Sequence, residues 1–281
     1  LELLKQRYLH IDETHVQVLK EPGRKNTSDS YMWVYCSIRD AVNSIRYFEY
    51  QPGRSGKYPE AFLREYEGYI HTDAYSGYNA VSGVKRCLCY THLRRAFVEA
   101  LPKDIHNSEA SKPAEAILRL NQLFNIESEL EALPPDQKKK ERLIREKPLL
   151  EAFWSWAEKS AIGELPKSKL SKAFHYALNN REGFWNYLED GNCSISNSLA
   201  ENCIRPFVIG RKNWLFSGSP KGAEASAGIY TLVETAKANG LAPMKYIKYI
   251  LSDMPGSAFL EHPEYLDDYL PWNPLVKEFC R

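Results

Sequence analysis

Apolar residues in the first hundred positions recur with the short, alternating period of β-strands. Five such runs are predicted strands: residues 9–19, 31–38, 44–50, 69–72 and 86–89. Two helices are predicted among and after them, at residues 59–66 and about 91–101. This part of the chain therefore combines strands with helices.

From about residue 103 to residue 166 the apolar positions follow only a helical period. The predicted apolar stripes contain Leu118, Leu120, Leu123, Phe124 and Leu130 in one helix and Leu143, Ile144, Leu149, Phe153 and Trp156 in the next. Between them, the KKKER run at residues 138–142 is interpreted as a solvated helix face, with phosphate contact as the alternative. Later helices are predicted at residues 169–188, 198–208, 223–239 and 243–254, and the last 25 residues are expected to wrap the surface.

The order of these elements predicts an α/β fold. It is the order of a ribonuclease H-like core, a mixed five-stranded sheet flanked by helices, with a helical insertion, although other α+β domains share it. The expected division is a first core part at residues 1–102, the insertion at 103–166, a second core part at 167–240, and a C-terminal helix and tail at 241–281.

Composition narrows the class of protein without deciding its function. Hydrophobic residues make up 43% and charged residues 26%, as in ordinary folded proteins, and no apolar run approaches the roughly 20 residues that span a bilayer. A cytoplasmic protein is expected, and its scattered cysteines fit a reducing compartment. A further region is expected to precede the first leucine. With a net charge of +1, binding to nucleic acid would require local basic patches.

Three acidic residues are candidates for phosphodiester chemistry. Asp12 lies inside a strand-like segment, where an acid is disfavoured unless something compensates it. Asp73 follows the predicted strand at 69–72, and Glu201 lies in the opening turns of a helix. Taken singly, each has a structural explanation, as a turn residue or as a solvated helix position. Two divalent ions that cut DNA need such carboxylates to converge from separate elements.

Six blocks of sequence stand out, and each of these three acids lies in one of the first three. The blocks are HIDET at residues 10–14, DAYSGY at 73–78, NSLAENCIRP at 197–206, GRKNWLF at 210–216, IYTLVETAKANGLAP at 229–243 and LPWN at 270–273. In order and spacing the blocks resemble bacterial transposases of the insertion sequence 66 group, which belong to the acidic-triad (DDE) class. The resemblance covers almost the whole chain, with departures at His15 and at the residues from Ser196 to Ser198.

The resemblance implies an enzyme that cleaves transposon ends and transfers the strand to target DNA. Its metal-binding and catalytic triad would be Asp12, Asp73 and Glu201, which are expected to converge on two Mg²⁺ ions, with Mn²⁺ as a possible substitute. Implied partners are the transposon ends, the target DNA, further copies of the chain assembled on DNA, and accessory proteins, in association with the nucleoid. A nuclease or resolvase without strand transfer and a non-catalytic DNA-binding remnant remain as alternatives.

Two further groups of residues are candidates beside the triad. Arg205, Arg211, Lys212 and Trp214 follow Glu201 and are predicted to contact DNA through phosphates and a stacking face, with packing on the core as the alternative. Cys89 and His92 form C-x-x-H, for which a structural or substrate-orienting role is preferred. Zinc is not expected there, because a structural zinc site needs four ligands and no second pair of cysteine or histidine residues stands at a convincing spacing.

Overall fold

The computed structural model describes residues 2–39, 41–102 and 111–281, whose contacts form two compact units. Unit 1 comprises Leu1–Tyr66, Asn79–Ser82 and Leu199–Arg281, and unit 2 comprises Glu67–Tyr78 and Gly83–Ser198. Both units contain strands and helices, so the predicted mixed α/β class is confirmed. The four-part division of the sequence stays a prediction.

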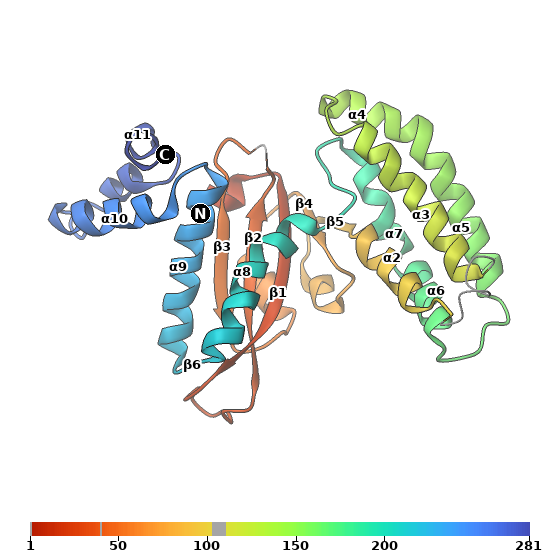
Figure 1. Cartoon of the computed structure of the whole chain (residues 1–281), viewed down its shortest axis with the longest axis horizontal. Coiled ribbons are helices and arrows are strands. Elements are labelled where there is room, and N and C mark those ends of the chain that lie inside the picture. Colours follow the sequence, from red (N-terminus) through yellow and green to blue (C-terminus); the bar gives the residue numbers. More distant parts are fainter. Residues whose placement is uncertain (1, 40, 103–110) are drawn as a thin grey trace. The chain divides into compact units, whose positions relative to one another are not determined.

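Unit 1 is built on an antiparallel meander (Figure 1). Strand β2 (Asp29–Ser37) pairs with β1 (Tyr8–Val18) on one side and with β3 (Arg46–Gln51) on the other. The predicted strands are confirmed to within two residues at each end. A two-residue strand, β6 (Phe216–Ser217), adds a parallel pairing to β1 that is too short for the sequence to predict.

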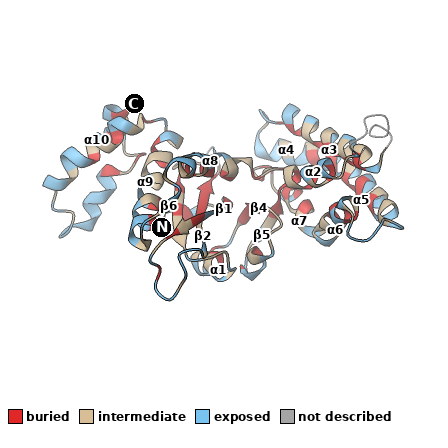
Figure 2. Ribbon diagram, turned by 60° about the horizontal axis from the view of Figure 1, so that its bottom comes forward, coloured by how far each residue is buried: buried red, intermediate tan, exposed pale blue. Residues whose placement is uncertain are grey.

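Helices cover both faces of this meander. On one face, α8 (Ser198–Trp214) and α9 (Pro220–Ala238) pack against the even-numbered residues of the strands, among them Val16, Val34 and Phe48. On the other face Phe62, the last residue of α1 (Lys57–Phe62), stacks on Tyr35 with ring centroids 3.9 Å apart. Buried residues accordingly concentrate on β1 and β2 (Figure 2).

The outer edge of β3 is closed by side chains of α9 rather than by another described strand. The Thr235 hydroxyl accepts from the Arg46 amide at 3.1 Å and donates to the Arg46 carbonyl at 3.2 Å. One turn earlier, Thr231 Oγ1 accepts from the Phe48 amide, and one turn later Asn239 Nδ2 donates to the Ser44 carbonyl. The spacing of four residues places all three on one face of the helix, so they satisfy an edge that would otherwise be open to another strand.

Unit 2 combines one pair of strands with a group of helices. Strands β4 (Tyr69–Thr72) and β5 (Lys85–Leu88) are parallel, as predicted in position to within one residue. The helices are α2 (Tyr90–Glu99), α3 (Lys112–Glu129), α4 (Pro135–Glu141), a π-helical segment (Arg142–Glu146), α5 (Lys147–Ala161), α6 (Lys169–Asn179) and α7 (Arg181–Trp185), with a 3₁₀ turn at Asn186–Glu189. Another 3₁₀ turn, Ser76–Ala80, has its last two residues in unit 1. The predicted single helix at 169–188 is wrong, because Asn180 leaves the helical conformation with φ −115° and ψ 12°. Residues 103–110 of the predicted insertion lie outside the described residues.

The π-helical segment changes which side of the insertion faces inward. A π turn takes more residues than an α turn and so rotates the following side chains. Leu143 and Ile144, predicted to be buried, are 43% and 68% exposed, whereas Arg142 and Glu146 are fully buried. The solvated reading of residues 138–142 is therefore wrong for Arg142. Leu118 is also exposed, but Leu120, Leu123 and Phe153 are buried as predicted.

The C-terminal part of unit 1 forms a small core of its own. Helix α10 (Pro243–Asp253) packs against α11 (Pro274–Cys280) through Tyr246, Ile250 and Val276. Short 3₁₀ turns at Met254–Gly256 and Pro263–Tyr269 connect them, and another, Glu2–Lys5, begins the unit. The tail, expected to wrap the surface, also contains helix α11, whose Val276 and Cys280 are buried.

Candidate active site

Asp12 lies in the middle of β1, on the face of the meander that α8 covers. Successive side chains of a strand alternate between faces, so Asp12 shares its face with Val16 and Val18, which belong to the core beneath α8. Its Oδ1 accepts the Glu13 amide at 2.9 Å. Glu13 points to the opposite face, where it forms an ion pair with Arg54 at 2.6 Å. The alternation of the strand therefore places the two adjacent acids on opposite faces. Asp12 is half-buried on the face that α8 covers, and Glu13 is paired with Arg54 on the other face.

Glu201 lies in the first turn of α8, at the border of the surface that this helix packs against the meander. Ala200, Ile204 and Phe207 are buried in that contact, and each residue turns the helix by about 100°. Glu201 is consequently half-buried at the border of the contact. Asp12 and Glu201 thus belong to the same unit and to the same side of its sheet.

The predicted helix at 198–208 in fact continues to Trp214, through Pro206 and Gly210. This extension places the basic residues of the GRKNW segment on the helix that carries Glu201. Arg205 and Lys212 fall on the same stripe as Glu201, at spacings of four and eleven residues, and both are exposed. A stripe of exposed basic side chains therefore lies next to the carboxylate, and its contact with DNA stays a prediction.

Arg211 and Trp214 have structural contacts in unit 1. Arg211 Nη1 donates to Thr14 Oγ1 on β1 at 3.2 Å, which ties the end of α8 to the strand that carries Asp12. The ring of Trp214 packs edge-on against Phe207, with centroids 5.2 Å apart. These contacts match the packing alternative, and DNA contact by either residue stays a prediction.

Asp73 lies directly after β4 in unit 2. Its Oδ1 accepts the Tyr75 amide at 2.9 Å, an interaction typical of an aspartate that starts a turn. The carboxylate is half-buried. Because Asp73 belongs to unit 2 and the other two acids to unit 1, convergence of all three stays a prediction.

Arg86 on β5 holds the backbone that carries Asp73, and sequence reasoning missed it. Its Nη2 donates to the Asp73 carbonyl at 2.6 Å and to the Tyr75 carbonyl at 2.8 Å, while Nε donates to Thr72 Oγ1 at 2.7 Å. No local pattern marks this arginine, because its partners lie more than ten positions earlier along the chain. Tyr176 on α6 was missed as well; burial, followed by the negative charge of Asp73, raises the pKa of its phenol.

Cys89 is the N-terminal cap residue of α2, and His92 lies in the first turn of that helix. The Cys89 thiol is buried and accepts the Asn197 amide at 3.1 Å. This bond fixes the segment that leads into α8, which agrees with a structural role. The substrate-orienting role and the expected lack of zinc remain predictions.

A second group of metal-type donors lies inside unit 2. One ligand atom each of His71, Cys87 and Cys193 lies within 4.8 Å of the others, and all three residues are buried. His71 Nε2 already accepts the Ser194 amide at 2.8 Å. The group is also one donor short of a structural zinc site, so it carries no assignment.

Two models of protein families match the chain. The one described as "Transposase IS66 family" matches residues 1–225, and the one described as "IS66 C-terminal element" matches residues 231–272. The chain belongs to the IS66 transposase family. Within the described part of the chain, no helix is both long enough and apolar enough to cross a membrane.

Curated relatives of this IS66 family member occur in Sinorhizobium fredii (strain NBRC 101917 / NGR234). "Uncharacterized protein y4hP" is 28% identical over 285 residues, which cover 94% of this chain and 50% of that protein. "Uncharacterized protein y4jD" is 25% identical over 278 residues, covering 93% of this chain and 52% of that protein. The chain spans about half the length of the curated relatives that it matches.

Proposed function

We propose that this chain is the catalytic region of a DNA transposase that cuts transposon ends and joins them to target DNA. The observation that carries the proposal is the match to the IS66 transposase family across residues 1–225, which include all three acids. Asp12 and Glu201 on one side of the unit 1 sheet, beside exposed Arg205, support it. The core is proposed to be ribonuclease H-like, which suits the meander β1–β2–β3 followed by a helix and a parallel strand pair.

Asp12, Asp73 and Glu201 would hold two Mg²⁺ ions. Carboxylate oxygens are the ligands that Mg²⁺ prefers, and all three acids are half-buried rather than fully enclosed, so the donor set fits these ions. When bound, the ions would activate the attacking oxygen and stabilise charge on the leaving oxygen.

The remaining residues would position the DNA and the acids. Arg205 and Lys212 would hold backbone phosphates beside Glu201, and Arg86 would keep the Asp73 turn in place. In the first step the oxygen of water attacks phosphorus, the bond from phosphorus to the 3′ oxygen breaks, and a free 3′-hydroxyl remains on the transposon end. In the second step this hydroxyl attacks a target phosphodiester and releases a target 3′-hydroxyl. No covalent bond between protein and DNA is required.

The test is cleavage and strand transfer with a labelled transposon-end duplex in Mg²⁺, using the full-length protein. Asp12→Asn, Asp73→Asn and Glu201→Gln should each lower the cleavage rate at least about a hundredfold, because each removes a charge that electrostatic catalysis needs. Their affinity for DNA, measured in Ca²⁺, should change little. Glu131→Gln, an exposed position of unit 2, is the matched control and should cut normally.

Other results would redirect the assignment. Cleavage without joining would identify a nuclease or resolvase, and binding without cleavage would identify a non-catalytic remnant. Near-normal cutting by Glu201→Gln would mean that the third carboxylate is elsewhere, with Glu234 on α9 as the next candidate.

A further inference from the structure

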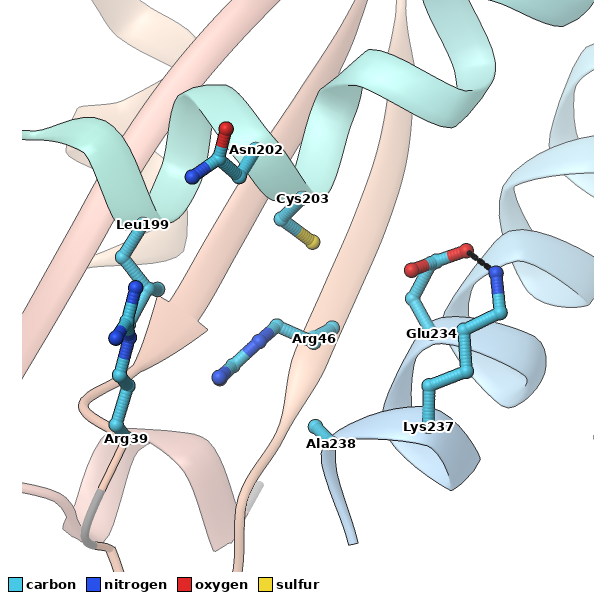
Figure 3. Close-up of a pocket in the computed structure, with 8 residues that line it drawn as sticks. All are labelled: Arg39, Arg46, Leu199, Asn202, Cys203, Glu234, Lys237 and Ala238. Atoms are coloured by element: carbon cyan, nitrogen blue, oxygen red, sulfur yellow. Dashed lines mark hydrogen bonds and ion pairs between the residues drawn. The ribbon is translucent and has the colours of Figure 1, made fainter. Parts of the chain in front are cut away.

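A pocket of about 270 Å³ lies in unit 1 beside the first turns of α8 (Figure 3). Helix α8 contributes Leu199, Asn202 and Cys203 to its wall, a different side of the helix from the one that carries Glu201. Helix α9 contributes Glu234 and Lys237, which come from the sequence block at 229–243. Thr231, Thr235 and Asn239 of that block close the edge of β3, whereas Glu234 and Lys237 have no part in that contact or in the proposed chemistry.

The pocket contains a buried guanidinium without a carboxylate partner among the described residues. Arg46 is 9% exposed, and its Nη1 donates to the carbonyls of Ser37 and Ile45, both at 2.8 Å, and to Ser37 Oγ at 3.3 Å. Its guanidinium group points into the pocket (Figure 3). No described residue accepts a hydrogen bond from Nε or Nη2. A buried charge is costly unless an opposite charge compensates it, and two carbonyl oxygens and one hydroxyl supply only part of that compensation.

A second arginine faces the same space. In Figure 3 the Arg46 guanidinium points toward the side chain of Arg39, which extends toward Leu199, and the side chain of Arg39 has no bonded partner in the part of the chain that the structure describes. Lys237 pairs with Glu234 at 2.7 Å. Among the described residues that line the pocket, three cations therefore face one carboxylate, which favours a bound anion.

We propose that this pocket binds a backbone phosphate of DNA, away from the bond that is cut. Planar guanidinium groups match the oxygens of a phosphate in pairs, and the Asn202 amide offers a further neutral donor. Asn202 and Lys237 are exposed, so a phosphate within a polymer can reach the pocket. The inference rests on the proposed function, since it takes DNA as the ligand. It assigns Lys237 of the block at 229–243 to anchoring DNA rather than to catalysis.

The experiment measures the affinity of the full chain for a transposon-end duplex in Ca²⁺ at several salt concentrations. Arg39→Gln and Lys237→Gln should each flatten the dependence of log K on log salt concentration, by about 0.9 if one phosphate contact is lost. Arg64→Gln removes the same charge from an exposed position just beyond α1 and should leave the slope at the wild-type value. Circular dichroism of each variant checks that folding is retained.

A second arm uses inorganic phosphate at matched ionic strength. Phosphate should raise the Tm of the wild type and of Arg64→Gln, but not that of Arg39→Gln. The proposal would be overturned if the salt slopes of Arg39→Gln and Lys237→Gln equalled that of the control Arg64→Gln, at the wild-type value. If the three slopes stay at the wild-type value but Arg39→Gln abolishes the rise in Tm with phosphate, the pocket binds free phosphate. That result also overturns the DNA contact.

The outcome is separable from the proposed function, because the slopes report binding and not cutting. If the variants keep the wild-type salt slope while Glu201→Gln loses cleavage, the phosphate contact is rejected and the transposase assignment is retained. A flattened slope in a protein that cuts no DNA would keep the pocket and remove the catalytic assignment.

Discussion

The position of Asp73 depends on one arginine. Arg86 binds the carbonyls of Asp73 and Tyr75 and the Thr72 hydroxyl, so it fixes the backbone on both sides of the carboxylate. A shift of about 1 Å in a catalytic group can cost about a hundredfold in rate. Arg86 is therefore expected to act on catalysis without touching the reacting atoms.

We predict that Arg86→Gln lowers the single-turnover cleavage rate by about ten- to a hundredfold and leaves the DNA dissociation constant nearly unchanged. Arg86→Lys should recover part of the rate, since lysine keeps a charged hydrogen-bond donor but lacks the several N–H groups of the planar guanidinium. Lys85→Gln is the control, because Lys85 forms an exposed ion pair with Glu189, lies over the Tyr69 ring, and makes no hydrogen bond or ion pair with the described residues of the Asp73 turn. A loss of affinity equal to the loss of rate would contradict a positioning role.

A second residue, Glu146, gives unit 2 a dependence on pH. Its burial and the negative charge of Glu127 raise the pKa of Glu146 from 4.5 to about 8. Between these values the folded state binds more protons than the unfolded chain, so the free energy of unfolding falls as pH rises. The contribution is fully present below about pH 4.5 and is lost as the pH passes about 8.

We predict that Glu146→Gln flattens this fall, which amounts to at most about 1.4 kcal/mol per pH unit. The variant should match the wild type near pH 5 and exceed it in stability near pH 8. Urea unfolding at both values, followed by circular dichroism, measures the difference. Glu151→Gln changes an exposed glutamate of α5 and should keep the wild-type slope; parallel profiles for all three proteins would exclude Glu146 as the titrating group.

At the scale of elements, one buried arginine bonds both to the helical insertion and to the rest of unit 2. Arg142 forms two bonds to the Glu127 carboxylate, at 2.6 and 2.8 Å. It also donates to the carbonyls of Tyr187, Asp190 and Cys193. All its donor atoms are therefore used, and α3 is joined to the segment that precedes α8.

Arg142→Met should lower the free energy of unfolding by about 3–5 kcal/mol, because it leaves the buried Glu127 carboxylate without its main partner. Lys139→Met, at an exposed position of the same KKKER run, should change stability by less than about 0.5 kcal/mol. Urea titrations of both variants give the comparison. Similar costs for the two would mean that the buried pair contributes little.

The contact between α9 and β3 gives a smaller, local effect. Thr235→Val keeps the shape of the side chain but removes the hydroxyl that bonds both backbone groups of Arg46. We expect a loss of about 1–3 kcal/mol, since a buried amide and carbonyl lose their partner. Thr235→Ser should recover most of it. Amide hydrogen exchange at Arg46 should be faster in the valine variant alone; unchanged exchange would contradict the edge-closing role.

At the scale of the whole molecule, the proposed metal site makes a prediction about the two units. If one pair of ions takes ligands from both, Mn²⁺ should raise the thermal stability of unit 1 and unit 2 together. Asp12→Asn and Asp73→Asn, one in each unit, should both abolish the increase, and EDTA should reverse it in the wild type. Stabilisation that survives Asp73→Asn would place the metal in unit 1 alone.

The sequence by itself determined the strands, most helices and the family. Apolar alternation fixed β1 to β5 to within two residues because a strand buried on one or both faces leaves a strong periodic signal. The start of α9 was placed three residues late, although Ser219 and Pro220 are a cap and a first-turn proline that the sequence displays. Motif spacing around Asp12, Asp73 and Glu201 was enough to identify the IS66 family, because such spacing survives when overall identity is low.

Only the tertiary structure decided which polar residues are buried together. Arg142 lies in a charged run that looks solvated, and a π-helical turn with a distant glutamate brings it inside. Arg46, Arg39 and Lys237 form one pocket from β3, the loop before it and α9, separated by up to about two hundred positions. Periodicity reports the side of an element on which a residue lies. It does not report what faces that side, because this depends on how distant segments pack.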